Sequence, residues 1–258
     1  MKSFPFLFIL IYAFFQLNHF GCHSPVEPTQ PQELIPLAVG NEWLYHRWYA
    51  VPTIVDTMRE VVLSDYDITL GDNTYTVYGY QRFHNTVEYE SEAPKEKILS
   101  KSNMYDFYSL SESDKFVIPY QWLRANTDHG VYSFGGISQT DTLFLKNIHY
   151  KYPGNAGDEW EYPEISYHYT DQEFSIGDTI TFELVGINEK FESDIASYGG
   201  CYVYRWSERG TYPPGPIYWW NHFAYIKPGI GVVAVHTQDV TNPEHIVGQW
   251  ILIDYTLK

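Results

Sequence analysis

Residues 36–45 read PLAVGNEWLY, and residues 153–162 read PGNAGDEWEY. The two segments share Pro, Gly, Glu, Trp and Tyr at the same spacing, and each has Gly followed by Asn or Asp. Such a pair favours a tight turn, because glycine adopts the positive φ that other residues resist. Trp and Tyr at alternate positions favour a strand. We therefore predict that each segment is a turn leading into a strand, with Trp43 and Trp160 both buried.

The remainder of the chain follows the patterns of strands and hairpins. Apolar and polar residues alternate in Ile180–Leu184 and in Trp250–Leu257, which is the period of a strand with one buried face. Gly71-Asp72-Asn73 and Pro228-Gly229-Ile230-Gly231 each lie between two strand-like runs and predict tight hairpins. Val87–Ser102 is charged, lacks an apolar face and contains a proline, so we predict a loop or a short turn there.

These patterns predict an all-β fold with little helix. We expect a mainly antiparallel, curved sheet that forms an incomplete barrel or a sandwich within residues 34–258, built from two similar halves at about 34–146 and 147–258. Two copies are too few for a solenoid or a propeller. One continuous curved sheet and two small packed β domains are both compatible with the sequence.

The N-terminus has the features of an export signal, which we place at residues 1–21. A short basic start precedes the apolar run Phe4–Phe15, which falls short of the roughly 20 residues that a membrane-spanning helix needs. A small residue then directly precedes Cys22, an arrangement that resembles the lipobox of bacterial lipoproteins. This resemblance implies cleavage before Cys22 and its lipidation, for example with palmitate. His19 stands where Leu is usual, so cleavage by an ordinary signal peptidase is the alternative.

The cysteines and prolines that follow bear on this anchor. Residues 22–33 contain three prolines among polar residues and read as an extended tether between lipid and domain. The chain has only two cysteines, Cys22 and Cys201. If Cys22 is lipidated, Cys201 has no intramolecular partner, and we expect a buried thiol that acts as a small apolar side chain. If Cys22 is not lipidated, a Cys22–Cys201 disulfide in an oxidising compartment is the competing interpretation.

Charge and motifs limit the classes of function. With 16 Lys and Arg against 32 Asp and Glu, the net charge is −16, which argues against nucleic acid as a partner. The sequence contains no phosphate-binding glycine loop, Gly-x-Ser-x-Gly elbow, His-Glu-x-x-His or paired-cysteine metal signature, so we expect no catalytic residue, cofactor or metal. Asp65-Tyr66-Asp67 with Asp72 lacks the regular loop of a calcium site. A catalytic carboxylate pair stays open, because its separation is a three-dimensional quantity.

Aromatic residues make up 18% of the chain and give the only candidate binding site. Alternation places Tyr202, Tyr204 and Trp206 on one face of a strand, and a proline-stiffened loop carries Trp219 and Trp220. Together these rings are predicted to form a stacking surface for a glycan or an apolar groove. The alternative is that they fill the core of the sheet, since aromatic residues favour strands and are largely buried.

Two short motifs carry a resemblance to a class of proteins. Pro36-Leu37-x-x-Gly40-Asn41-x-Trp43-x-Tyr45 and Tyr225–Val233 resemble the first strand and the last Pro-Gly-Ile-Gly hairpin of uncharacterised β-rich bacterial lipoproteins. The architecture is also similar to the curved, incompletely closed sheets of envelope lipoprotein carriers. The resemblance implies a lipid-anchored, all-β protein of the cell envelope and brings no catalytic residues with it.

From these observations we expect a non-enzymatic binding module, anchored to a bacterial membrane through its N-terminal lipid. The outer membrane, with the domain facing the periplasm or the surface, is the expected location. The partner is an apolar or glycan ligand, or another envelope protein. The alternative is a structural or assembly lipoprotein, and a hydrolase is a third class that requires converging catalytic groups in one cleft.

Overall fold

The structure is a computed structural model that describes residues 32–50, 53–87, 116–117, 120–168, 171, 173–211 and 217–258. Residues Glu33–Lys258 form one compact unit. The described residues contain strands and no helix, and therefore no helix with the length and hydropathy that a membrane crossing requires. The strands are β1 (Glu42–Ala50), β2 (Thr53–Leu70), β3 (Asn73–Val87), β4 (Phe116–Val117), β5 (Tyr120–Thr127), β6 (Gly130–Ser138), β7 (Thr142–Lys151), β8 (Glu159–His168), β9 (Glu173–Glu192), β10 (Ser197–Thr211), β11 (Ile217–Lys227), β12 (Gly231–Asp239) and β13 (Asn242–Thr256).

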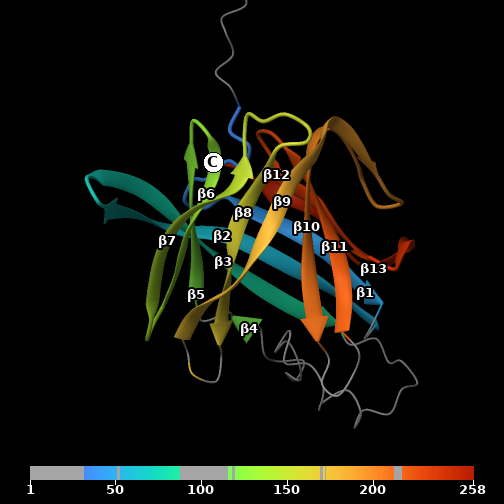
Figure 1. Cartoon of the computed structure of the whole chain (residues 1–258), viewed down its shortest axis with the longest axis horizontal. Helices are drawn as coiled ribbons and strands as arrows, with labels where there is room; N and C mark the ends of the chain where they lie inside the picture. Colours follow the sequence, from blue (N-terminus) through green and yellow to red (C-terminus); the bar gives the residue numbers. More distant parts are fainter. Residues whose placement is uncertain are drawn as a thin grey trace, which may run out of the picture. The chain divides into compact units, whose positions relative to one another are not determined.

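All strands belong to one curved sheet, which confirms the predicted all-β class (Figure 1). The order is β7-β6-β5-β3-β2-β1-β13-β12-β11-β10-β9-β8, with β4 added to β3 beside this path, and every neighbouring pair is antiparallel. Of the two arrangements compatible with the sequence, the single continuous sheet is therefore correct. Residues 88–102, where a loop was predicted, lie outside the described residues, as do the signal segment and Cys22.

The sheet consists of two six-strand meanders with the same order. The first runs β1-β2-β3-β5-β6-β7 and the second β8-β9-β10-β11-β12-β13. β1 pairs with β13 and so joins the start of the first unit to the end of the second. The first unit includes all of β7 and ends at Lys151, a few residues after the boundary that the sequence suggested.

The other junction, between β7 and β8, has no backbone ladder among the described strands, so the barrel is incompletely closed. Side chains bridge it instead. Lys151 Nζ donates to Glu159 O at 3.4 Å, and Tyr204 Oη donates to Lys151 O at 2.6 Å. The backbone N–H of Phe174 in β9 donates to Asp141 Oδ2 at 2.7 Å. These contacts join β7 and the residue before it to β8, β9 and β10 without a backbone ladder between β7 and β8.

The turns that begin the two units have the same geometry, as the sequence predicted. Gly40 has a φ of 90° and Gly157 a φ of 92°, in the left-handed region that favours glycine. Gly40 N donates to Val62 O at 2.8 Å, and Gly157 N donates to Leu184 O at 2.7 Å. The second strand of each unit is therefore fixed to the turn at an equivalent carbonyl.

Both tryptophans that follow these turns are buried, as expected. Trp43 is 4% exposed and Trp160 is 8% exposed. They differ in one respect. Trp43 Nε1 donates to Ile230 O at 2.6 Å, whereas Trp160 Nε1 has no partner among the described atoms. The two halves thus share a fold while their interiors are not identical.

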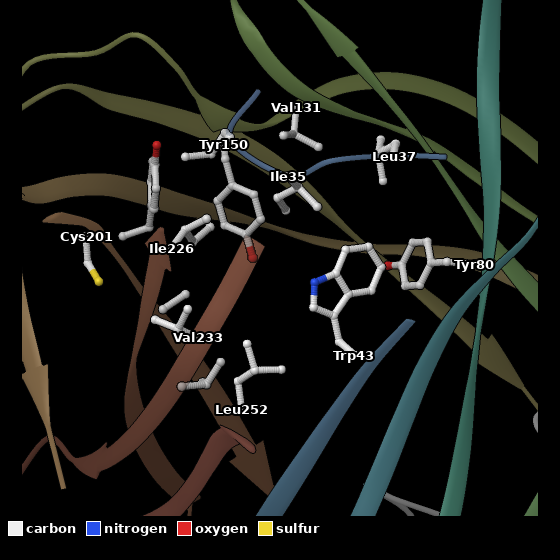
Figure 2. Close-up of a cluster of buried hydrophobic side chains, with 14 of the residues drawn as sticks. Ile35, Leu37, Trp43, Tyr80, Val131, Tyr150, Cys201, Ile226, Val233 and Leu252 are labelled. Atoms are coloured by element: carbon white, nitrogen blue, oxygen red, sulfur yellow. The ribbon is translucent and has the colours of Figure 1, made fainter. Parts of the chain in front are cut away.

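The segment before β1 closes one end of the barrel interior. Leu34, Ile35 and Leu37 are buried in the main core cluster, and Figure 2 shows Ile35 and Leu37 facing the rings of Trp43 and Tyr80. Backbone and side-chain hydrogen bonds fix the segment in place: Gly229 N to Glu33 O at 2.7 Å and Asn126 Nδ2 to Ile35 O at 2.8 Å. Packing therefore begins at the point where the predicted tether ends.

Candidate functional site

The barrel interior contains a cavity of about 290 Å³. It adjoins the core, because Tyr45, Tyr80 and Phe182 belong both to the core cluster and to its lining. The side chains that define it are Tyr45, Tyr49, Glu60, Tyr80, Arg82, Trp122, Arg124, Ser133, His149, Tyr150, Tyr162, Glu164, Ile165, Ile180, Phe182, Trp206, Glu208, His222, Val232, Val235, Thr237 and Trp250.

The internal repeat allows the two walls of this cavity to be compared residue by residue. Val62 faces Tyr80 across β2 and β3, and Leu184, the counterpart of Val62, faces Tyr204 across β9 and β10. In both ladders an unpaired residue follows directly on the earlier strand. Tyr80 and Tyr204 therefore occupy equivalent positions.

Two residues after these tyrosines the halves differ in chemistry. In the first half Arg82 faces Glu60, and in the second half Trp206 faces Phe182. The guanidinium Nε of Arg82 donates to Glu60 Oε1 at 2.6 Å. The rings of Trp206 and Phe182 stack with centroids 5.1 Å apart and planes at 16°. One wall of the cavity therefore carries an ion pair where the other carries an aromatic pair.

The contrast between a charged and an apolar side chain recurs two residues before Tyr80 and Tyr204, at Tyr78 and Tyr202. β3 pairs there with Arg124 of β5, and β10 pairs with Ile226 of β11. Since the second half forms the same strands with Ile226 in this place, the barrel itself does not require a charge there. The charges of the first half call for another reason, because burying ionised side chains costs free energy.

Arg124 is the charged group with the fewest protein partners. It is 8% exposed, and its guanidinium lies over the ring of Tyr80, with Cζ 4.4 Å from the ring centroid. Within the described chain it makes no hydrogen bond and has no carboxylate within 4 Å. Burial lowers the pKa of Arg124, but Tyr80, Tyr150 and Glu60 outweigh this and raise it. The residue is therefore a buried cation whose donors face the cavity unused.

The other buried arginine of the first half that lines the same interior face is neutralised. Arg47 Nε donates to Asp56 Oδ1 at 2.6 Å, and its second terminal nitrogen contacts the other carboxylate oxygen. This bidentate pair cancels the charge locally. With Arg82 paired to Glu60, the unbalanced positive charge in this part of the cavity is that of Arg124.

His149 responds to this positive charge. Burial, followed by Arg124 and Arg82, lowers the pKa of His149 well below its usual value of 6.5. Its ring packs on Tyr150 and Tyr162, with centroids 4.2 and 4.8 Å away, and Nδ1 has no partner among the described atoms. His149 is therefore a neutral, buried ring at neutral pH.

This environment predicts an acid-sensitive contribution to stability. The unfolded chain protonates His149 as the pH falls through about 6.5, while the folded protein resists protonation, so the free energy of unfolding should decrease below that pH. We expect His149→Phe to remove about 1 kcal/mol of the loss that wild type shows between pH 7 and pH 5.5 in urea titrations. His129→Phe, at an exposed site, is the control. An unchanged pH dependence in His149→Phe would contradict the assignment.

Aromatic and acidic groups of the second half complete the cavity. Trp206 also stacks on His222, with centroids 4.9 Å apart and planes at 16°. His222 Nε2 lies 3.1 Å from Glu208 Oε2. Burial, followed by Glu208 and Asp178, raises the pKa of Glu164. The second half therefore lines the cavity with a stack of rings and with the carboxylates of Glu164 and Glu208.

The structure brings one of the five rings proposed from sequence into the cavity. Trp206 lines it; Tyr204 is fully buried in the core, and Tyr202 packs edge-on against Tyr152 with centroids 5.1 Å apart. Trp219 is 51% exposed, and Trp220 is partly buried. Both belong to β11 rather than to a loop, and neither lines the cavity. The predicted alternation along β10 holds, but the five rings do not form one surface.

The residues that sequence analysis missed are Glu60, Arg82, Arg124 and His149. Alternation offered a signal, since Tyr78, Tyr80 and Arg82 share one face of β3. An Arg at the end of such a series is, however, also what a solvent-facing strand end looks like. Their common location depends on pairing between strands distant in sequence.

Two other predicted features lie apart from the cavity. Cys201 is buried, with its thiol Sγ 3.7 Å from Tyr198 O, and burial raises its pKa, as expected of an inert thiol. It has no disulfide partner among the described residues. Asp67 accepts a hydrogen bond from Thr76 Oγ1 at 2.9 Å on the surface. The described residues contain no group of three His, Cys, Asp or Glu side chains placed to hold a metal ion.

The fold and the cavity together define an incompletely closed β barrel with an internal cavity. No family model and no curated protein matches the chain. Two solved structures are similar at 9% identity each. One, described as a lipoprotein from Parabacteroides distasonis, has a TM-score of 0.44 over 88% of this chain and 99% of that one. The other, described as an exported protein with a YmcC-like fold from Bacteroides fragilis, has a TM-score of 0.42 over 88% and 100%.

Proposed function

We propose that the protein is a lipid-anchored binding protein of the bacterial cell envelope that holds a small organic ligand inside its barrel. The observation that carries the proposal is the internal cavity of about 290 Å³ with stacked aromatic rings in one wall. Ligand sites of roughly 300 to 1,000 Å³ are typical, so this one suits a small ligand. A purely structural lipoprotein has no need of such a space.

The lining favours a ligand with a flat or apolar body. Phe182, Trp206 and His222 form a continuous stack in which neighbouring planes deviate by 16°. Because Phe182 and His222 cover the two faces of Trp206, the stack presents ring edges to the cavity. These edges give an apolar surface for an aromatic ring, a lipid-like chain or the apolar side of a sugar. Trp122 and Trp250 add further ring surface to the same lining. The proposed ligand therefore agrees with the apolar or glycan class expected from sequence, at a site that shares only Trp206 with the predicted one.

The experiment uses N-phenyl-1-naphthylamine, a neutral dye that fluoresces in apolar sites, with residues 33–258, which form a compact unit. We expect saturable binding at one site per chain. Ile180→Trp fills the cavity and should weaken binding at least tenfold, whereas Ile176→Trp, on the same strand but exposed, should leave it unchanged. Equal binding by both variants, or no saturable binding by wild type, would refute the proposal.

A further inference from the structure

We infer that the ligand carries an oxyanion, a carboxylate or a sulfonate, that pairs with Arg124. The inference rests on the proposed function, since it assigns the chemistry of a ligand in the same cavity. An anionic ligand is not what the net charge of −16 favours, since a negatively charged protein by itself repels anions. The local charge around Arg124 decides the matter, because interactions in a partly closed interior are screened less than those at the surface.

Arg124 has unused donor capacity. A guanidinium presents five N–H donors in a planar fork that matches a carboxylate. Arg47 pairs with Asp56 through two of its nitrogens, and Arg82 donates its Nε to Glu60. In Arg124 the described chain offers only the face of Tyr80. Buried charges are ordinarily paired, so we assign the anion that the described chain does not supply to the bound ligand.

The internal repeat also supports an oxyanion site at Arg124. The equivalent of Arg124 is Ile226, and the residue facing Arg124 on β6 is Ser133, which also lines the cavity. The corresponding residue facing Ile226 on β12 is Val232. The first half thus places a cation and a hydroxyl where the second half places two aliphatic side chains. A binding site for an oxyanion needs both donors, whereas the strands need neither.

The other side chains of the cavity wall around Arg124 also suit an anion. Tyr80 and Tyr150 line the cavity near Arg124, and burial raises the pKa of Tyr150 to about 12. The phenols therefore stay protonated, as hydrogen-bond donors require. Glu60, the acid whose charge acts on Arg124, is already hydrogen-bonded to Arg82. An anion at Arg124 would consequently meet these donors, while the other carboxylates of the lining, Glu164 and Glu208, belong to the wall formed by the second half.

The test compares two dyes that share an aromatic body and differ in charge. 1-Anilinonaphthalene-8-sulfonate carries a sulfonate that N-phenyl-1-naphthylamine lacks. We expect the sulfonate dye to bind residues 33–258 about tenfold more tightly than the neutral dye, since a charge-assisted hydrogen bond is typically worth this factor. Arg124→Ile, which copies the second half, should remove this preference, so that the two dyes bind with similar affinity.

Two further variants make the outcome decisive. Arg124→Lys keeps the charge but not the planar fork, and should retain part of the preference. Arg205→Met removes an exposed arginine that pairs with Glu183, and should leave both affinities unchanged. If neither dye binds wild type, the proposed function fails. If both bind equally, or if Arg124→Ile keeps the full preference, the cavity stands and the assignment of Arg124 is overturned.

Discussion

Replacing Trp43 by Ala is expected to lower the free energy of unfolding by about 3 to 5 kcal/mol, the range for removing a buried Trp. The indole is 4% exposed and belongs to the core cluster that holds the segment before β1 (Figure 2). Its Nε1 also donates to Ile230 O at 2.6 Å, in the turn between β11 and β12. The substitution therefore removes packing and a hydrogen bond between distant parts of the chain.

The repeat supplies a matched comparison. Trp160→Ala should cost a similar amount in packing, but Trp160→Phe should cost less than Trp43→Phe, because Trp160 Nε1 has no partner to lose among the described atoms. Trp219→Ala, at a position 51% exposed, should change stability by no more than about 0.5 kcal/mol. Chemical denaturation of each variant gives the values. A Trp43→Ala variant as stable as Trp219→Ala would show that the two halves are not organised by these residues.

The second large effect concerns location. We expect Cys22→Ala to move the protein from the membrane fraction to the soluble fraction, because the lipid attached to Cys22 is the proposed anchor. A single acyl chain binds membranes weakly, whereas several chains on one cysteine hold a protein stably. Fractionation of cells expressing the full chain, followed by detection in each fraction, measures the distribution.

Cys201→Ala is the control for this experiment. Its thiol is buried in the barrel, so the variant should remain with the membrane. A disulfide between the two cysteines would instead make both variants equivalent. Wild-type protein that is already soluble, with a mature N-terminus beyond Cys22, would contradict lipid anchoring and favour ordinary export.

Much of the fold could be predicted because its signals are local. The turn before Trp43 needs glycine at a left-handed φ, and the same requirement recurs before Trp160. The hairpin at Gly71 closes with Leu70 facing Asn73, as its turn residues indicate. Such features act over a few residues and are visible in a single sequence.

The site could not be predicted in the same way. Glu60, Arg82 and Arg124 come from three strands, and only the register of those strands shows that they share one wall. Trp219 and Trp220 were predicted to line the site from a loop, but both belong to β11 and neither lines the cavity. Trp219 is exposed on this strand, and Trp220 is partly buried. The net charge of −16 disfavoured an anionic ligand, but it does not describe the local charge of the cavity. There Arg82 is paired with Glu60, and Arg124 has no carboxylate partner among the described residues.

The most direct test of the account is a crystal structure of residues 33–258 with 1-anilinonaphthalene-8-sulfonate bound. The account predicts the dye inside the barrel, with its sulfonate within hydrogen-bond distance of the Arg124 guanidinium and its rings against Trp206. Dye bound only on the outer surface, or side chains occupying the cavity while the dye is bound elsewhere, would contradict it.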